Sequence, residues 1–222
     1  MYAMVYTRID ISFVLGRLAA FMQDPAEHHG QELRRLMRYL RSTIDLRISF
    51  GLRRGVSSAL EVYSDADYAA DKTDRKSITG FVGLIGGGPA FWGSKKQSSV
   101  STATTEAEYI AMCTTAKQGQ WIAQVLRDMG YPEYVAPNGT TVEMRGDNQG
   151  AIALAKNPQL TDRSKHIEVQ YHYVRELQER RKVNIIYVPT DQMAADALTK
   201  PASKGLLQRL MEQVQLRSPR RK

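Results

Sequence analysis

The chain has 222 residues, with 31 Lys or Arg against 23 Asp or Glu, so its formal net charge is +8. Its composition, 42% hydrophobic and 24% charged, is typical of a globular domain and excludes wholesale disorder, a collagen-like chain and a coiled-coil rod. The single Cys113 excludes an internal disulfide framework and no apolar run approaches the ~18–20 residues of a membrane span, so we expect an intracellular protein with nucleic acid as the default partner of its charge.

The N-terminal quarter of the chain is predicted to be helical. Residues 8–22 and 28–43 carry apolar side chains at three- and four-residue steps, the period of an amphipathic helix. Residues 46–52 suit a short strand, and residues 53–55 (Arg-Arg-Gly) suit a linker. We therefore interpret residues 1–54 as a helical extension.

The rest of the chain is predicted to form a mixed sheet with helices. Residues 59–65, 78–85 and 90–92 suit three successive strands, which favours an antiparallel meander. Further on, helices and strands alternate, and the overall order β-β-β-α-β-α-β-α predicts an α/β fold whose five-stranded sheet continues from the meander into parallel strands. The later helices are expected from residue 102 and over 118–129, 148–156 and 165–181, with strands over 140–145 and 183–188 and a last helix from residue 192.

The positive charge is concentrated at the two ends. Residues 1–54 hold nine Arg and five acids, and residues 217–222 hold four cations and no acid, whereas residues 55–216 hold 18 of each sign. The basic tail is either solvated or in contact with phosphates, and the sequence leaves both alternatives open. Because residues 55–216 are neutral in a chain expected to bind nucleic acid, we expect the acidic residues of this part to cluster at a functional site.

Four acidic residues stand where predicted elements meet. Asp65 ends the first strand, Glu108 lies near the start of the first body helix, Asp147 follows the fourth strand, and Asp196 is expected to begin the last helix. Singly, each has a structural interpretation as a turn former, cap or helix-face charge. Together, at the neighbouring strand ends of one sheet, they would repel unless hard cations such as Mg²⁺ or Mn²⁺ bind. Two such ions ~3.5–4 Å apart can activate water and stabilise the leaving oxygen of a phosphodiester.

Six short motifs stand in the body of the chain, namely Tyr63-Ser-Asp-Ala-Asp-Tyr68, Gly93-Ser-Lys-Lys-Gln97, Ser101-Thr-Ala-Thr-Thr-Glu-Ala-Glu-Tyr109, Gly146-Asp-Asn-Gln-Gly-Ala-Ile152, Arg163-Ser-Lys-His-Ile167 and Ala195-Asp-Ala-Leu-Thr-Lys200. In this order they resemble the ribonuclease H domain of copia-type retrotransposon polyproteins, over about residues 59–216. The leading segment, from Thr7 to Ser42, resembles the helical end of the adjoining reverse transcriptase. The resemblance implies a ribonuclease H-like domain over 55–216, preceded by the extension 1–54 and followed by a basic tail over 217–222.

The resemblance also implies an activity, namely hydrolysis of the RNA strand of RNA·DNA hybrids with two Mg²⁺ ions, for which Mn²⁺ is a possible substitute. Carried over residue by residue, the catalytic and metal-binding positions are Asp65, Glu108, Asp147 and Asp196. Asp67 and Glu106 are their nearest rivals. Asp67 shares the strand parity of Asp65, and Glu106 points to a different helix face from Glu108, so both rivals are interpreted as solvated or supporting.

Seven further residues are candidates for contact with the substrate. Asn148 and Gln149 carry amides that suit 2′-hydroxyls, although Asn148 also suits a helix cap. The patch Lys95, Lys96 and Gln97 at a strand exit suits either phosphate contact or a solvated turn. Thr104 and Thr105, before Glu108, either line the substrate groove or begin the helix. These remaining candidates are Lys95, Lys96, Gln97, Thr104 and Thr105.

One departure from the family pattern concerns a histidine. Many ribonucleases H carry a mobile His in the loop before the last acid, but residues 189–195 hold none, and Asp191 is a speculative substitute. His166 is interpreted as structural.

Two alternatives to a hybrid-specific ribonuclease stay open: a catalytically idle binding or scaffold module, and a ribonuclease H-like enzyme acting on DNA. We expect the reverse transcriptase portion of the same polyprotein as a partner, no membrane contact, and a cytoplasmic retroelement particle or the nucleus as the location. The oligomeric state is left open.

Overall fold

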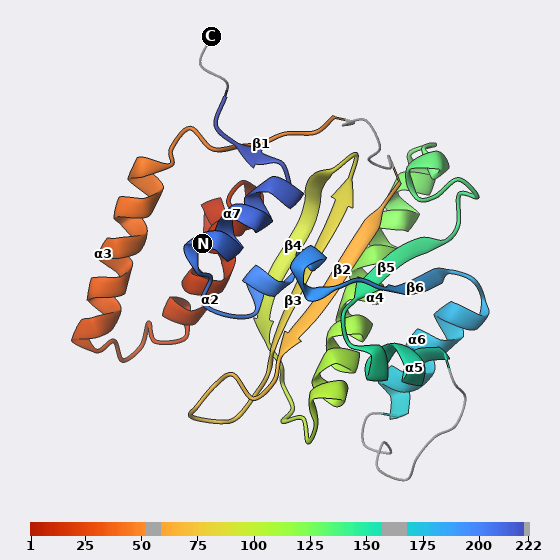
Figure 1. Ribbon diagram of the computed structural model, residues 1–222, viewed down its shortest axis with the longest axis horizontal. Helices are drawn as coiled ribbons and strands as arrows, with labels where there is room; N and C mark the ends of the chain where they lie inside the picture. The colour runs from red at the N-terminus through yellow and green to blue at the C-terminus, as the bar shows by residue number, and fades with distance from the viewer. Residues whose placement is uncertain (52–58, 157–167, 220–222) are drawn as a thin grey trace.

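A five-stranded mixed sheet forms the centre of the computed structural model, which describes residues 1–51, 59–156 and 168–219 (Figure 1). The strand order is β4-β3-β2-β5-β6, in which β3 runs antiparallel to β4 and to β2, while β5 lies parallel to β2 and to β6. The predicted α/β mixed sheet is therefore confirmed. Its strands are β2 (Glu61–Asp67), β3 (Ile78–Ile85), β4 (Gly88–Lys96), β5 (Val142–Gly146) and β6 (Val183–Tyr187).

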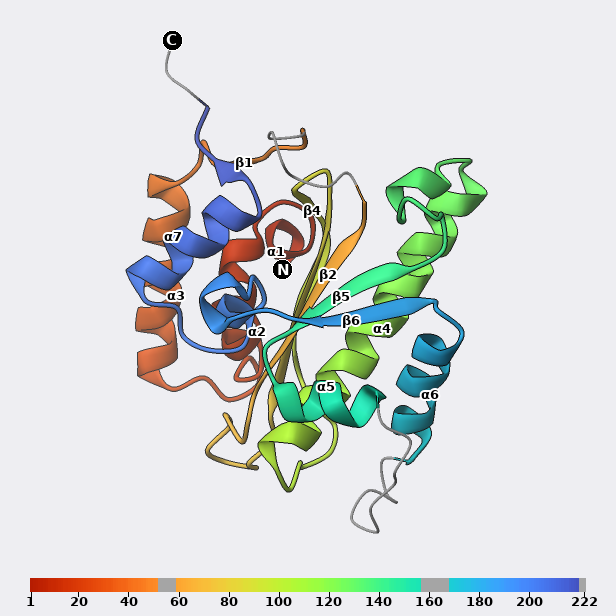
Figure 2. The ribbon, with the colours of Figure 1, turned by 45° about the vertical axis from the view of Figure 1, so that its right-hand side comes forward.

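Helices cover both faces of this sheet, as Figures 1 and 2 show. One face carries α4 (Thr104–Asp128), α5 (Gln149–Lys156) and α6 (Glu168–Glu179). The other face carries the chain's two ends, where β1 (Arg47–Ile48) pairs antiparallel with β7 (Leu216–Arg217). The helices on that side are α1 (Tyr2–Tyr6), α2 (Ser12–Ala19), α3 (Glu27–Ser42) and α7 (Lys204–Gln213). Among the described residues, short 3₁₀ segments are η1 (Ile9–Ile11), η2 (Pro132–Tyr134), η4 (Thr190–Gln192) and η5 (Asp196–Leu198).

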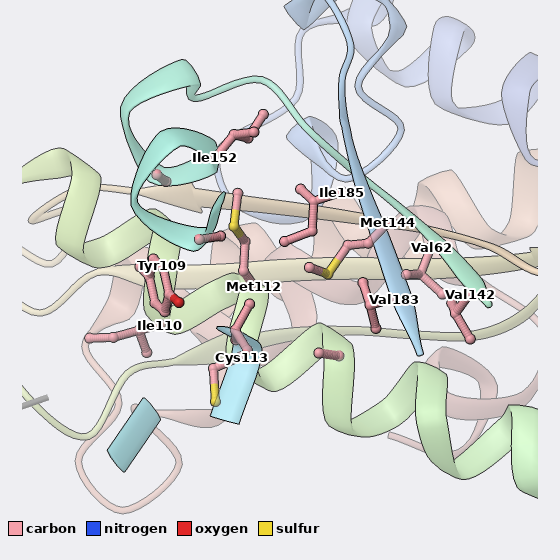
Figure 3. Packing of buried hydrophobic residues seen from close by; sticks show 14 of the residues in the cluster. Val62, Tyr109, Ile110, Met112, Cys113, Val142, Met144, Ile152, Val183 and Ile185 are labelled. Atoms are coloured by element: carbon pink, nitrogen blue, oxygen red, sulfur yellow. The ribbon is translucent and has the colours of Figure 1, made fainter. Parts of the chain in front are cut away.

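The larger hydrophobic core lies between the sheet and α4 (Figure 3). In β5, Val142 and Met144 are buried while Glu143 and Arg145 are half-buried, which is the alternation of a strand with one covered face. Opposite them, Tyr109 and Met112 of α4 are almost fully buried, and Cys113 lies beside them. This core fixes α4 against the parallel half of the sheet.

A second core lies on the opposite face and includes the N-terminal segment. Ile9 is completely buried there, in one cluster with Val82 of β3 and Leu210 of α7. The Trp92 indole N–H donates to the backbone oxygen of Met4 over 2.8 Å, which ties α1 to the edge strand β4. The segment that contains α1, η1 and α2 thus covers the meander, and α3 packs against α2. The predicted linker and the boundary after residue 54 lie outside the described residues.

Two helices differ from the sequence-based prediction. The two helices expected from residue 102 and over 118–129 are one helix, α4, because Gly119 does not interrupt it. A Cβ at Gly119 would lie 3.3 Å from Val62, so the glycine lets the helix approach the sheet closely. The last helix begins at Lys204, after Pro201, so Asp196 begins the short η5 instead. Within the part of the chain that the structure describes, no helix combines the length and apolar character of a membrane span.

Replacing Ile9 tests whether the N-terminal segment is part of the folded unit. We expect Ile9→Ala to lower the free energy of unfolding of the whole chain by roughly 2–5 kcal/mol, because it leaves a cavity in the second core. Met22→Ala, at a side chain that is 74% exposed, is the control and should change it by less than ~0.5 kcal/mol. Unfolding in urea measures both, and an unchanged midpoint for Ile9→Ala would contradict the shared core.

Candidate metal centre

Three carboxylates from separate elements converge at one edge of the sheet. Asp65 lies near the end of β2, Asp147 directly follows β5, and Glu108 lies in the second turn of α4. Each offers an oxygen atom, and the three oxygens lie within 4.8 Å of one another. Because β2 and β5 are parallel neighbours, their carboxyl ends meet at the same edge, which places the two aspartates together as predicted.

Small residues bring Glu108 to the strands. Ala66 of β2 and Ala107 and Ala111 of α4 form a separate buried cluster, so the first turns of the helix lie close to the strand. A backbone hydrogen bond from Ala66 reaches the Glu108 carboxylate. Glu108 is only 5% exposed, so its carboxylate is hydrogen-bonded by the strand backbone and has little contact with water.

Asp196 reaches the same edge from the other face, on η5. Its neighbour Thr199 is buried, and the Thr199 hydroxyl lies 2.7 Å from Asp65 Oδ2 and 2.9 Å from the backbone oxygen of Asp196. Gly80 makes room for this contact, because it is the cross-strand partner of Asp65 and has no side chain on that face. A Cβ at Gly80 would lie 2.6 Å from Thr199 Cγ2 and 2.8 Å from the Ala195 carbonyl oxygen.

The electrostatics of the cluster favour a cation. The pKa of Glu108 is raised to about 9, first because burial penalises the charged carboxylate and then because Asp65 and Asp147 lie nearby. The pKa of Asp65 is raised to about 6, chiefly by burial, while the Thr199 hydrogen bond opposes the rise. Hard oxygen donors that repel one another at this spacing are the donor set that fits a divalent ion such as Mg²⁺ or Mn²⁺.

The two rival acids have other positions. Glu106 is 6% exposed, and its carboxylate accepts hydrogen bonds of 2.7 Å from both the backbone N–H and the hydroxyl of Thr102. The interpretation of Glu106 as solvated is therefore wrong. The alternative, a supporting role, describes Glu106 better, because the Glu106 side chain holds the turn that precedes α4. Asp67 is half-buried and outside the three-carboxylate group.

The predicted substrate residues near the cluster lie at the start of α5. Asn148 Oδ1 accepts from the backbone N–H of Ala151 over 2.9 Å, so the capping interpretation of Asn148 is confirmed. Gln149 is exposed and Asn148 is half-buried. Thr105 lies close by, since a Cβ at Gly150 would be 3.3 Å from Thr105 Oγ1, while Thr104 is exposed.

The predicted cationic patch has three different environments. Lys95 is exposed, and Lys96 Nζ lies 2.8 Å from both Asp71 Oδ2 and Asp74 Oδ2. Gln97 is buried: its amide group donates to Thr79 Oγ1 and to the backbone oxygen of Ala107, and its oxygen accepts from Ser101. Its amide thus links β3 and α4 inside the protein.

Several residues at the centre escaped sequence reasoning. In the loop without a histidine, Asp191 is exposed, whereas the Thr190 hydroxyl donates to Asp147 Oδ2 over 2.8 Å. Lys200 Nζ lies 2.5 Å from Asp196 Oδ1. Thr199 and Lys200 are the last two residues of the motif that contains Asp196, so the sequence places them near the site. The motif alone does not indicate which atoms their side chains contact. The motif over 163–167, with His166, lies outside the described residues.

Comparison with known proteins gives relatives over nearly the whole chain. It is 37% identical over 211 residues to the retrovirus-related Pol polyprotein from transposon RE1 of Arabidopsis thaliana, which covers 95% of this chain and 14% of that protein. It is also 37% identical over 220 residues to the Pol polyprotein from transposon TNT 1-94 of Nicotiana tabacum, covering 98% of this chain and 16% of that protein. The chain therefore spans about one seventh of the length of these relatives.

Among solved structures, the chain is similar to a ribonuclease H1 isolated from compost by a metagenomic approach, with 16% identity and a TM-score of 0.48. The match covers 64% of this chain and 93% of that one. No protein-family model matches the chain.

Adding one methyl group at Gly80 tests how Asp65 and η5 are held together. We expect Gly80→Ala to lower the free energy of unfolding by about 1–3 kcal/mol, because the backbone oxygen of Ala195 must move away from the new Cβ. Gly205→Ala is the matched control, because that glycine lies in α7 with open space around it, and it should stabilise by ~0.4–1 kcal/mol. Urea unfolding measures the stability of each variant. A Gly80→Ala variant as stable as the unmodified chain would show that the contact between Gly80 and the Ala195 backbone is not tight.

Neutralising Glu108 tests the cost of burying its charged carboxylate beside Asp65 and Asp147. A carboxyl whose folded-state pKa is raised gives stability that is complete below its ordinary value of 4.5 and is lost as the pH rises toward about 9. In EDTA at pH 8, Glu108→Gln should therefore be more stable than the unmodified chain by on the order of 3 kcal/mol, with a flatter dependence of Tm on pH.

Glu106→Gln is the control for this experiment, and it should be destabilised, because its carboxylate accepts two hydrogen bonds from Thr102. Added Mg²⁺ should narrow the gap between the unmodified chain and Glu108→Gln, since an ion stabilises only the intact cluster. Thermal unfolding between pH 5 and 9 gives the answer, and a Tm for Glu108→Gln below that of the unmodified chain at pH 8 would contradict the repulsion.

Proposed function

The chain belongs to the family of retrovirus-related Pol polyproteins of copia-like transposons, and from this premise we propose that it is a ribonuclease H, an endonuclease that hydrolyses the RNA strand of RNA·DNA hybrids. The observation that carries the proposal is the convergence of Asp65, Glu108 and Asp147 within 4.8 Å at the strand ends. These residues stand in the motifs that resemble the ribonuclease H domain of such polyproteins.

The proposed metal ligands are Asp65, Glu108, Asp147 and Asp196, which would hold two Mg²⁺ ions or Mn²⁺ in their place. Bound ions of this kind supply an activated water and stabilise the leaving oxygen of a phosphodiester. The protein's own contribution is orientation. Thr199 holds Asp65 from one side, and the Thr190 hydroxyl holds Asp147. Each hydroxyl bonds one carboxylate oxygen, so the other oxygen of that carboxylate can face a cation.

The proposed substrate contacts follow from the groups that remain free to donate. Since Asn148 Oδ1 caps α5, its amide NH₂ is the part that would donate to a 2′-hydroxyl of the RNA strand, with Gln149 beside it. Thr104, Thr105 and Lys95 would contact the sugar-phosphate backbone. Lys96 would add only its field, because its ammonium is paired with Asp71 and Asp74.

The proposed partner is the reverse transcriptase portion of the same polyprotein, with residues 1–54 as the end of that portion. The packing of Ile9 in the second core supports a role for this segment in the fold of the nuclease itself. The basic residues 217–222 would add a salt-sensitive attraction to the hybrid.

A cleavage assay with an RNA·DNA hybrid tests the proposal. The chain should cut the RNA strand when Mg²⁺ is present and not in EDTA, and it should leave duplex and branched DNA intact. We expect Asp147→Asn to lower the cleavage rate on the order of a thousandfold, because it removes a ligand charge, while the circular dichroism spectrum is unchanged.

Asp128→Asn is the matched control, because it makes the same chemical change on the exposed last residue of α4, and it should alter the rate by less than about twofold. Cleavage of branched or duplex DNA in preference to hybrid would favour the DNA-acting alternative. Hybrid binding without cleavage at any metal concentration would favour an idle module. Unimpaired cleavage by Asp147→Asn would overturn the assignment of the site.

A further inference from the structure

The acids at the sheet edge divide into two groups of different character. Asp65, Glu108 and Asp147 each offer an oxygen, and these three oxygens lie within 4.8 Å of one another. Asp196 is outside that group and already has a cation, since Lys200 Nζ lies 2.5 Å from its Oδ1. The structure therefore presents one compact three-ligand site and, next to it, one carboxylate that is paired within the chain.

The two members of this pair differ in how freely they can move. The Asp196 side chain is 9% exposed on η5, whereas the Lys200 side chain is 43% exposed. The four-carbon stem of Lys200 lets its ammonium move while the backbone, next to Pro201, stays in place. Lys200 also interacts electrostatically with Asp65 and Asp67. Asp67 is half-buried and is not one of the proposed metal ligands, so its carboxylate can pair with the Lys200 ammonium in place of Asp196.

We propose that Lys200 is a tethered cation that takes the position of the second divalent ion beside Asp196, so that this ion binds only by displacing the ammonium. The inference rests on the proposed two-metal site and adds an order to it: the three-carboxylate group fills first and Asp196 fills second. Lys200 is in this sense a positioning residue, which acts on the second ion through Asp196.

Charge balance explains why such a device suits this site. With no ion bound, the three-carboxylate group and the adjacent Asp196 leave a surplus of negative charge, and the Lys200 ammonium offsets the charge of Asp196. When a second divalent ion approaches, the nearby ammonium repels it and lowers its affinity. The pair thus neutralises Asp196 when no metal is bound, and it weakens the binding of the second ion.

A Mn²⁺ titration of the full chain by calorimetry, with no substrate, tests this inference. The unmodified chain should bind one ion tightly and a second weakly. In Lys200→Met the second ion should bind at least ~10-fold more tightly, while the affinity for the first changes little. Lys200→Arg keeps the charge and should resemble the unmodified chain. Lys204→Met is the matched control, because it removes the same charge from an exposed position on α7.

Thermal unfolding guards against a variant that is merely unstable. Lys200→Met leaves Asp196 unpaired, so its Tm in EDTA should be lower than that of the unmodified chain, and saturating Mn²⁺ should raise it by a larger increment. An unchanged or weaker second site in Lys200→Met overturns the inference and leaves the proposed function standing. Loss of hybrid cleavage with unchanged Mn²⁺ binding would likewise overturn it and assign Lys200 to the substrate. If the unmodified chain binds no first ion, the metal centre itself fails.

Discussion

Buried carboxylates that face one another repel, and the fold of this protein has to hold three of them within 4.8 Å. Left to themselves, Asp65, Glu108 and Asp147 would separate or take up protons, and the pKa of Glu108 is raised by burial first and then by the two neighbouring carboxylates. Each carboxylate is therefore carried by an element that cannot easily move. Asp65 lies on the central strand β2, Glu108 is fixed by the close packing of α4, and Asp147 follows a strand that is paired on both sides.

The two hydrophobic cores supply the opposing force from the two faces of the sheet. The core under α4 presses Glu108 toward the strand ends, and the core under η5 and α7 brings Asp196 and Thr199 to the same edge. The N-terminal segment belongs to this second core through Ile9. A stretch of chain that carries no proposed ligand thereby helps to hold the last acid in place, which is why the site depends on nearly the whole chain.

This arrangement trades stability for chemistry. A glutamine in place of Glu108 relieves repulsion, and a methyl group on Gly80 disturbs the contact that joins Asp65 to η5, so the sequence at these positions is explained by the site and not by packing alone. Pairing of Asp196 with Lys200 reduces the same repulsion from within the chain. A divalent ion and a lysine are two ways of neutralising one carboxylate, and the proposed nuclease uses them in turn.

Local patterns in the sequence were sufficient for the sheet and for the three clustered acids. Strand alternation and turn residues placed β2, β3, β5 and β6 close to their observed bounds, whereas β4 extends well beyond the predicted residues 90–92. The motifs around Asp65, Glu108 and Asp147 located the residues that meet at the strand ends. These predictions succeeded because period and strand-end position are properties of short segments, and parallel neighbouring strands bring their ends together by rule.

Partners distant in the chain were decided only by the tertiary structure. Gln97 and Lys96 stand side by side in a polar stretch, yet one is buried under α4 and the other pairs with Asp71. In the same way, the Thr199 hydroxyl bonds a carboxylate 134 residues away. Periodicity shows that a side chain is buried or exposed, but the atom that it meets depends on how two cores pack against one sheet. The sequence by itself therefore determined the acids and the strands that carry them, and the packing of the cores determined what holds those acids in place.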